Sequence, residues 1–137
     1  MSTDLTPRGI RNANPGNIRR TGIQWLGLAA VQGDPDFCQF VTAEYGIRAM
    51  ARLLHNYKED GLSTIRQAIG RWSPQADHND VAAYVTIVAQ HCGIGPDDTT
   101  DYDVIMPSLI EAIIQHENGM QPYLVSTIQA GIDLANV

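Results

Sequence analysis

The feature that most constrains this chain is a helical spacing of apolar residues that begins near Thr42 and continues almost to the C-terminus. In each run the apolar side chains recur every three or four positions, which places them on one face of an α-helix. Glycine, or a serine followed by proline, ends the runs, so the pattern predicts several separate helices. The expected helices extend from Thr42 to Gly61, from Ser63 to Trp72, from Asn79 to Gly93, from Pro107 to Gly119 and from near Pro122 to Leu134.

The segment before Thr42 has a different character. Residues 1 to about 35 are rich in Gly, Pro, Asn and Arg, and tight turns are expected at 14–17 and 33–35. Residues 37–41 form a short apolar run with strand-like character. A chain of 137 residues has about the length of one domain and can bury a core. We therefore expect a mostly α fold, a single domain over 1–137 with about five helices and at most a short β element.

The charge balance argues against nucleic acid as the main partner. The formal net charge is −6, whereas proteins that bind phosphate backbones usually gather Lys and Arg on one face. A group of arginines stands near the N-terminus, and a solvated surface is the favoured interpretation of it. The group consists of Arg8, Arg11, Arg19 and Arg20.

Membrane insertion, secretion by a leader and metal chemistry are not expected either. The first seven residues lack the apolar core of a signal peptide, and no apolar run reaches the ~18 residues of a membrane span. Cys38 and Cys92 stand apart and are interpreted as small buried hydrophobes. None of the four histidines has metal-ligand spacing, so neither a cofactor nor a metal is expected.

One segment could carry chemistry on local physics. Residues 113–119 bring Glu117 to the last turn of a strongly apolar helix that Gly119 ends. The C-terminus of a helix carries partial negative charge, which disfavours a glutamate anion there. A carboxylic acid that keeps its proton is what protonation of a glycosidic oxygen requires. The alternative is a solvated glutamate before a helix cap.

The stretch Ile113 to Ser126, IIQHENGMQPYLVS, resembles the catalytic segment of lytic transglycosylases and goose-type lysozymes. In that family an Ile- or Val-rich helix leads into Gln-Glu-Ser-Gly, an aromatic residue, Asn-Pro and a later Ser. The resemblance implies that Glu117 is the single catalytic acid, and Pro122 and Ser126 match the family's Pro and Ser. It also implies a lysozyme-like fold.

The same segment departs from the family at three positions. His116 stands where Gln is usual, Asn118 replaces the Ser after the glutamate, and Met120 replaces the aromatic residue. The departures at Asn118 and Met120 favour the alternative of a protein that keeps the fold and has lost catalysis. Gln121 and Tyr123 follow the acid and are candidate substrate contacts, with anchoring of the last helix as the alternative for Tyr123.

A second resemblance lies at the other end of the chain, to bacterial β-N-acetylglucosaminidase domains. There a comparable loop lines the sugar groove but follows the catalytic helix, whereas here the loop comes first. The reversed order predicts a circular permutation of the lysozyme-like fold, in which the N-terminal loop lies beside Glu117. The matching residues are Asn14 to Arg19, Trp25-x-Gly27, Phe37-x-x-Phe40, Glu44-x-Gly46-Ile47 and Leu53-Leu54.

Four residues of this region are further site candidates, each with a structural alternative. Asn14 and Asn17 could bind N-acetyl groups, or they could form the turn, to which Asn is well suited. Trp25 could stack on a sugar or pack in the core. Glu44 could be a second catalytic carboxylate, although a charge in the first turn of a helix is the favoured interpretation.

The whole chain also resembles short phage proteins described as virion structural proteins. They share the pattern of Arg8 to Arg19 and continue with a Trp-Ser/Ala-Pro and an Asn-Asp pattern, matched by Trp72 to Pro74 and by Asn79-Asp80. This resemblance implies phage origin without establishing an enzyme.

The leading hypothesis is a phage peptidoglycan-degrading enzyme of the lytic transglycosylase or muramidase type, with Glu117 as general acid and base. The alternative is a catalytically inactive virion structural or peptidoglycan-binding protein. The expected partners are bacterial peptidoglycan and other virion proteins, without nucleic acid or membrane insertion. The expected location is the virion, or the host cytoplasm before delivery to the periplasm.

Overall fold

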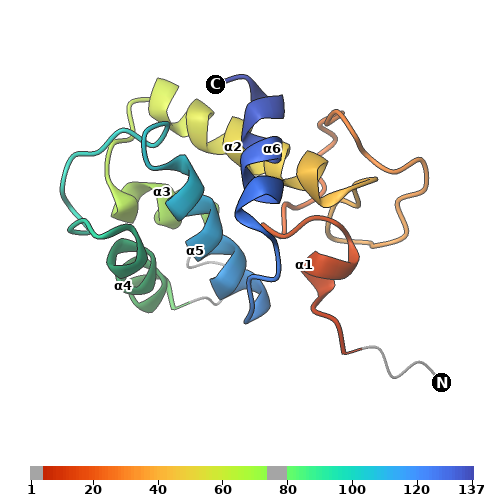
Figure 1. The fold of residues 1–137 in the computed structure, drawn as a ribbon, viewed down its shortest axis with the longest axis horizontal. Coiled ribbons are helices and arrows are strands. Elements are labelled where there is room, and N and C mark those ends of the chain that lie inside the picture. Colours follow the sequence, from red (N-terminus) through yellow and green to blue (C-terminus); the bar gives the residue numbers. More distant parts are fainter. Residues whose placement is uncertain (1–4, 74–79) are drawn as a thin grey trace.

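The structure is a computed structural model that describes residues 5–73 and 80–137. The predicted mostly α class is confirmed (Figure 1). Within the described ranges there is no sheet, and the strand-like run at 37–41 takes part only in isolated bridges, Phe37 with Arg19 and Phe40 with Leu28. The helices of this part of the chain are α1 (Arg8–Arg11), α2 (Ala43–Glu59), α3 (Ile65–Trp72), α4 (Val81–Cys92), α5 (Met106–Asn118) and α6 (Val125–Ala135).

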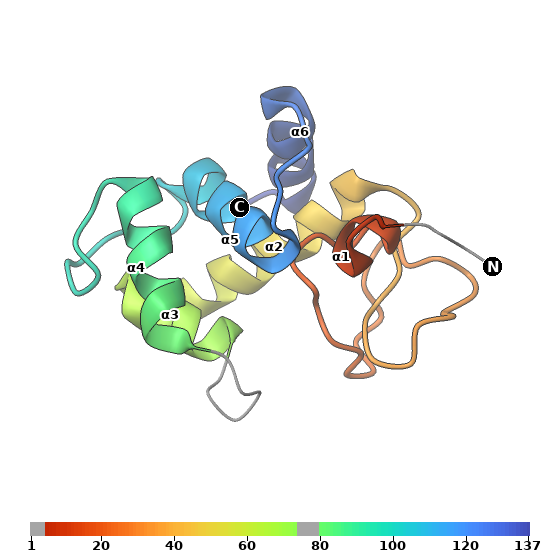
Figure 2. The same ribbon diagram turned by 90° about the horizontal axis from the view of Figure 1, so that it is seen from below.

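The long helix α2 runs through the middle of the molecule, and α6 packs across it (Figures 1 and 2). Helix α5 lies beside both, α3 and α4 cover one end, and α1 with the irregular 12–42 loop forms the other end. Apart from Tyr102, which lies between α4 and α5, the largest fully buried side chains come from α2, α3, α4 and α5, so one apolar core joins these described helices. None of the helices in the described residues is long and apolar enough to cross a membrane.

Several helix ends follow the local sequence signals. Helix α2 follows Thr42, as predicted, and α5 ends at Gly119, whose φ of 71° lies in the left-handed region that glycine favours. The predicted cap of α3 at Ser63 is wrong by one residue, because Thr64 forms a capping box with Gln67.

Two other helix starts also differ from the prediction. The expected start of α4 at Asn79 falls outside the described residues, and the side chain of Asp80 accepts a bond from the Ala83 N–H at the observed start. Helix α6 begins after Leu124, later than predicted, because the Gln121 side chain bonds both backbone groups of Tyr123 and holds 121–123 outside the helix.

The N-terminal segment holds a short helix that the composition did not indicate. The guanidinium of Arg8 in α1 forms a bidentate salt bridge with the buried carboxylate of Asp34, with Nε 2.6 Å from Oδ2. Asn12 donates to the same carboxylate, and these bonds, led by that from Arg8, hold the pKa of Asp34 well below its usual range. The solvated interpretation of the arginine group is therefore wrong for Arg8, which fastens α1 to the loop.

Candidate active site

Glu117 lies in the last turn of α5 and is half-buried. Its carboxylate receives hydrogen bonds from two other parts of the chain. Oε1 accepts from the Asn17 side-chain amide at 3.0 Å, and Oε2 accepts from the Tyr84 hydroxyl at 2.8 Å. Both carboxylate oxygens are therefore oriented by groups outside their own helix, which fixes the direction in which the acid faces.

Tyr84 is the site residue that the sequence analysis missed, because its place in the apolar stripe of α4 indicated core. The ring is buried and stacks on His116, with the centroids 3.7 Å apart. Burial and the neighbouring Glu117 carboxylate raise the pKa of Tyr84, so its hydroxyl stays protonated and acts as a constant donor. A signal was available, since a buried tyrosine hydroxyl usually requires a polar partner.

The side chains of Asn14 and Asn17 make different contacts. Asn14 is fully buried: its amide donates to the carbonyls of Ile18 and Cys38 and accepts from the Ile18 N–H. The turn interpretation is thus correct for Asn14, and the predicted substrate contact is wrong because no surface of it is exposed. Asn17 adopts a left-handed backbone, with φ of 51°, and this conformation directs its amide to Glu117.

Asn118, one of the departures from the transglycosylase pattern, connects the two ends of the chain. Its amide donates to the Pro15 carbonyl at 2.8 Å and to the Ile114 carbonyl at 3.0 Å. The loop that carries Asn17 is thereby tied to the end of α5. Gly9 makes room for this contact, since a Cβ there would lie 2.5 Å from Asn118 Oδ1 and 2.8 Å from Asn17 Oδ1.

A groove of about 440 Å³ opens beside Glu117. The 16–25 part of the N-terminal loop forms one wall, so the predicted proximity of this loop and the Glu117 helix end is confirmed. Tyr57 and Trp72 meet edge-to-face in the groove lining, with centroids 6.4 Å apart. A cleft that combines aromatic side chains with convergent polar groups is typical of a small-molecule or oligomer binding site. The aromatic residues of the lining are Trp25, Phe37, Tyr57 and Trp72.

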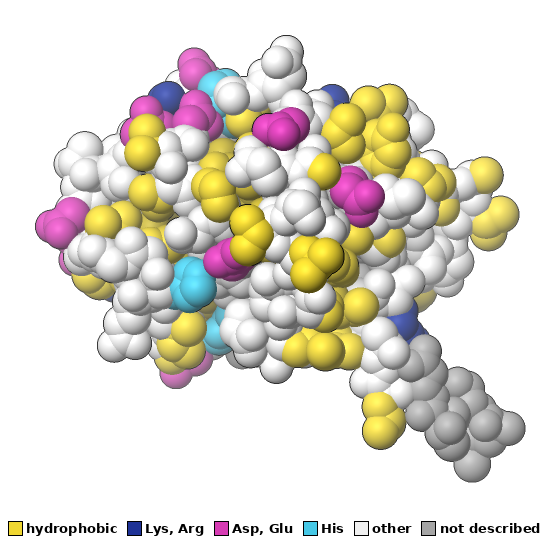
Figure 3. Space-filling model, viewed as in Figure 1, with side chains coloured by type: hydrophobic (Ala, Val, Ile, Leu, Met, Phe, Trp, Pro, Cys, Tyr) yellow, Lys and Arg dark blue, Asp and Glu magenta, His cyan; other side chains and the backbone are white. Residues whose placement is uncertain are grey.

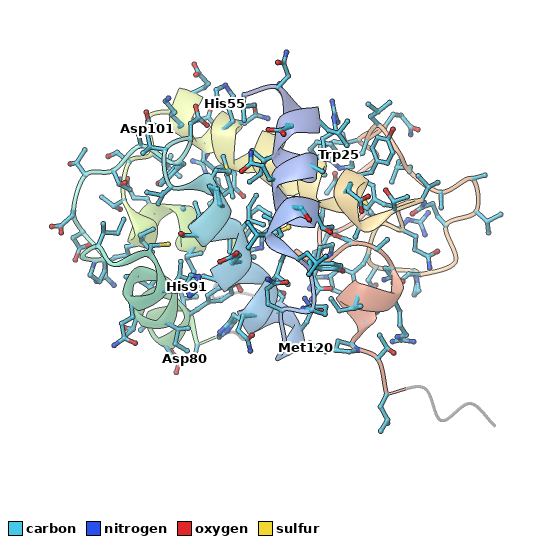
Figure 4. The ribbon with its side chains drawn as sticks, viewed as in Figure 1. Trp25, His55, Asp80, His91, Asp101 and Met120 are labelled. Carbon is cyan, nitrogen blue, oxygen red and sulfur yellow. The ribbon has the colours of Figure 1, made fainter. Side chains whose placement is uncertain are left out.

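Trp25 shows the predicted core packing, and its stacking on a sugar stays a prediction. It packs against the apolar core and lines the groove (Figure 4 marks its place near the start of α2). Its indole N–H is buried without a hydrogen-bond partner. Trp72, which the sequence analysis placed in the core, likewise packs on the core and faces the groove.

The chain has a counterpart among phage proteins. No family model matches, but the chain is 40% identical over 130 residues to Protein P5 of Pseudoalteromonas phage PM2, a match that spans 92% of this chain and 80% of that protein. The chain belongs to the family of this phage protein. The phage affiliation expected from the N-terminal motif is thus confirmed. The name P5 states no activity, so the chemistry has to be inferred from the site.

Glu44 is not brought to the groove. It occupies the first turn of α2 and does not belong to the groove lining. Burial raises the pKa of the Tyr123 hydroxyl, and the Glu44 carboxylate raises it further. This placement favours the helix-charge interpretation. It gives no support to a second catalytic carboxylate at that position.

Gln121 and Tyr123 also lie outside the groove lining. The Gln121 amide is engaged with the Tyr123 backbone, with Tyr123 N–H 2.6 Å from Oε1, and the Tyr123 ring packs against the core. These contacts favour the anchoring alternative for Tyr123 and give both residues a local role in the connection between α5 and α6. Met120 is 43% exposed in the same connection (Figure 4).

Proposed function

We propose that this phage protein cleaves the glycan strand of bacterial peptidoglycan, with Glu117 as its general acid and base. The observation that carries the proposal is the Glu117 carboxylate, held by Asn17 and Tyr84 at the wall of an aromatic groove. General acid–base catalysis needs a positioned titratable group within reach of the substrate, and this arrangement supplies one.

The chemistry follows from a single acid. Glu117 gives its proton to the glycosidic oxygen, so that N-acetylglucosamine leaves with a new hydroxyl. The resulting carboxylate then takes the proton from the C6 hydroxyl of N-acetylmuramic acid, whose oxygen bonds to C1 and closes a 1,6-anhydro ring. Glu117 ends protonated as it began, and no water is consumed.

The composition of the groove favours this course over hydrolysis with two carboxylates. Among the described residues of the lining, Glu117 is the only acidic side chain, and Glu44 lies elsewhere. Glycosidases with two carboxyl groups require both to flank the scissile bond. The lytic transglycosylase type is therefore preferred to the muramidase type.

The lysozyme-like ancestry belongs to the same proposal. The Asn14–Trp25 loop and the Glu117 segment resemble two parts of lysozyme-like enzymes that occur in the opposite order. Their contact through Asn17 and Asn118 is what a circular permutation requires, and it supports one. Delivery in the virion, or release from the host cytoplasm towards the periplasm, would bring such an enzyme to its substrate.

The central test is Glu117→Gln, which removes the proton donor and nearly preserves size and shape. We expect clearance of purified peptidoglycan to fall about 10²–10⁴-fold. Glu111→Gln is a matched control on the same helix, because the Glu111 carboxylate faces His91 at 3.3 Å and lies outside the groove lining. Mass spectrometry of the products would detect anhydro ends. Equal clearance by wild type and Glu117→Gln would rule Glu117 out.

The alternative function is an inactive virion structural or wall-binding protein. It is favoured by the departures at Asn118 and Met120 and by the relationship to a phage protein whose name gives no activity. A wild-type protein that leaves several wall types intact but sediments with them would establish wall binding without cleavage. One that neither cleaves nor sediments would leave the structural role.

A further inference from the structure

The groove differs in charge from the rest of the molecule. The chain has 15 Asp and Glu against 9 Lys and Arg, and carboxylates are spread over the face drawn in Figure 3, where Lys and Arg are sparse. Yet the described residues of the groove lining include two arginines, Arg19 and Arg71, and a single carboxylate, that of Glu117. Because two guanidinium groups outnumber one carboxylate in the lining, the cleft favours ligands of negative charge.

Arg71 lines the groove, and two contacts position its guanidinium. It comes from the last turn of α3, lies 5.3 Å from the centroid of the Tyr57 ring, and donates from Nη1 to Asp60 at 2.9 Å. A guanidinium has five N–H donors in a planar fork that fits a carboxylate. The bond to Asp60 engages Nη1, and Asp60 does not belong to the lining.

Arg19 is positioned in a related way on the wall formed by the N-terminal loop. Its guanidinium lies 5.0 Å from the centroid of Phe37, and that of Arg8 lies 4.6 Å from the same ring. Replacement of Arg19 would therefore disturb the packing around Phe37 as well as the charge. Arg71 is the cleaner residue to test, because its ion pair with Asp60 is exposed at both partners and contributes little stability.

We propose that the groove selects glycans that carry carboxylates and that Arg71 is a specificity-determining residue that binds them. This inference rests on the proposed function, since it names the part of the peptidoglycan strand that the groove recognises. Two sources share the chemistry: the lactyl carboxylate of N-acetylmuramic acid, and the carboxylates of the stem peptide joined to that lactyl group. A neutral chitin strand has neither.

The test measures glycan binding by calorimetry in the Glu117→Gln background, so that the ligand is not consumed. The probes are chitotetraose, a peptide-free tetrasaccharide of alternating N-acetylglucosamine and N-acetylmuramic acid, and the same tetrasaccharide with stem peptides. At low salt we expect the stronger of the two carboxylate glycans to bind about tenfold more tightly than chitotetraose, with the advantage shrinking as salt is raised. The stronger of the two identifies the source of the carboxylate.

Three variants separate Arg71 from general surface charge. Arg71→Gln should abolish most of the preference, and Arg71→Lys should keep part of it. Arg66→Gln should keep all of it, because Arg66 is on the same helix and pairs with exposed Asp97 away from the groove.

The outcomes distinguish this inference from the proposed function. Equal binding of neutral and carboxylate glycans, or equal losses in Arg71→Gln and Arg66→Gln, would overturn the selection by Arg71 and leave glycan cleavage standing. Failure to bind any of the three glycans would overturn both.

Discussion

The replacement Tyr84→Phe separates the hydrogen bond that orients Glu117 from the packing of the ring. The ring is 1% exposed and should remain stacked on His116. The lost bond, 2.8 Å long, ends on a carboxylate, and hydrogen bonds to charged groups contribute about 1.5–3 kcal/mol. Glu117 is only half-buried, so water from the groove can replace part of this bond. We therefore expect the free energy of unfolding to fall by about 1.5 kcal/mol.

The same change should slow catalysis, because the Glu117 carboxyl would keep only the bond from Asn17. A misplaced acid that costs about 1.4 kcal/mol in the transition state lowers the rate about tenfold. We expect this loss in kcat, with little change in KM, since Tyr84 does not line the groove. Clearance of purified peptidoglycan and urea denaturation are the two measurements.

Tyr102→Phe is the matched control. Tyr102 is also fully buried, and its hydroxyl donates to the Thr64 carbonyl at 2.6 Å. Neither Tyr102 nor Thr64 belongs to the groove lining. Loss of a bond to a neutral group should cost about 0.5–1.5 kcal/mol of stability and leave kcat unchanged. If both variants lost activity equally, or if Tyr84→Phe cleared walls at the wild-type rate, the positioning role of Tyr84 would be refuted.

Three further predictions concern the surroundings of the site. Glu44→Gln should change the free energy of unfolding by at most about 1 kcal/mol and leave wall clearance intact; a loss of clearance would restore Glu44 as a catalytic group. Gly9→Ala should destabilise the fold by about 1–3 kcal/mol, because the added Cβ would meet the side-chain amide oxygens of Asn17 and Asn118. Gly70→Ala in α3 is the control, because no atom lies near the added Cβ, and it should stabilise the fold by about 0.5–1 kcal/mol. Denaturation curves that reverse this order would refute the close packing at Gly9. Burial raises the pKa of Tyr57 from the usual 10.0 to about 12, and the pKa of Tyr84 is raised as well. Above pH 10.0 these tyrosines therefore ionise in the unfolded chain before they ionise in the folded protein, so the free energy of unfolding should fall as the pH rises. Thermal melts across this range should show a shallower fall in Tyr57→Phe.

The sequence by itself determined the longer helices, α2 to α6, and several of their ends. Apolar spacing and capping residues act within a few positions, so Thr42, Gly93 and Gly119 could be identified from their neighbours alone. The resemblance of residues 113–126 to transglycosylases likewise singled out Glu117, since that motif is contiguous. Where a local signal was ambiguous, as between Ser63 and Thr64, the error was a single residue, because both side chains can cap a helix.

Only the tertiary structure decided how the site is assembled. The donors to Glu117 come from residues 100 and 33 positions away, and their pairing depends on how α4, α5 and the N-terminal loop pack. Packing also separated Asn14, whose polar atoms bond within its own turn and to the Cys38 carbonyl, from Asn17, whose left-handed backbone turns its amide towards the acid. Such choices depend on which buried polar groups find partners, and a buried group without a partner costs about 1–3 kcal/mol whatever its neighbours in the sequence.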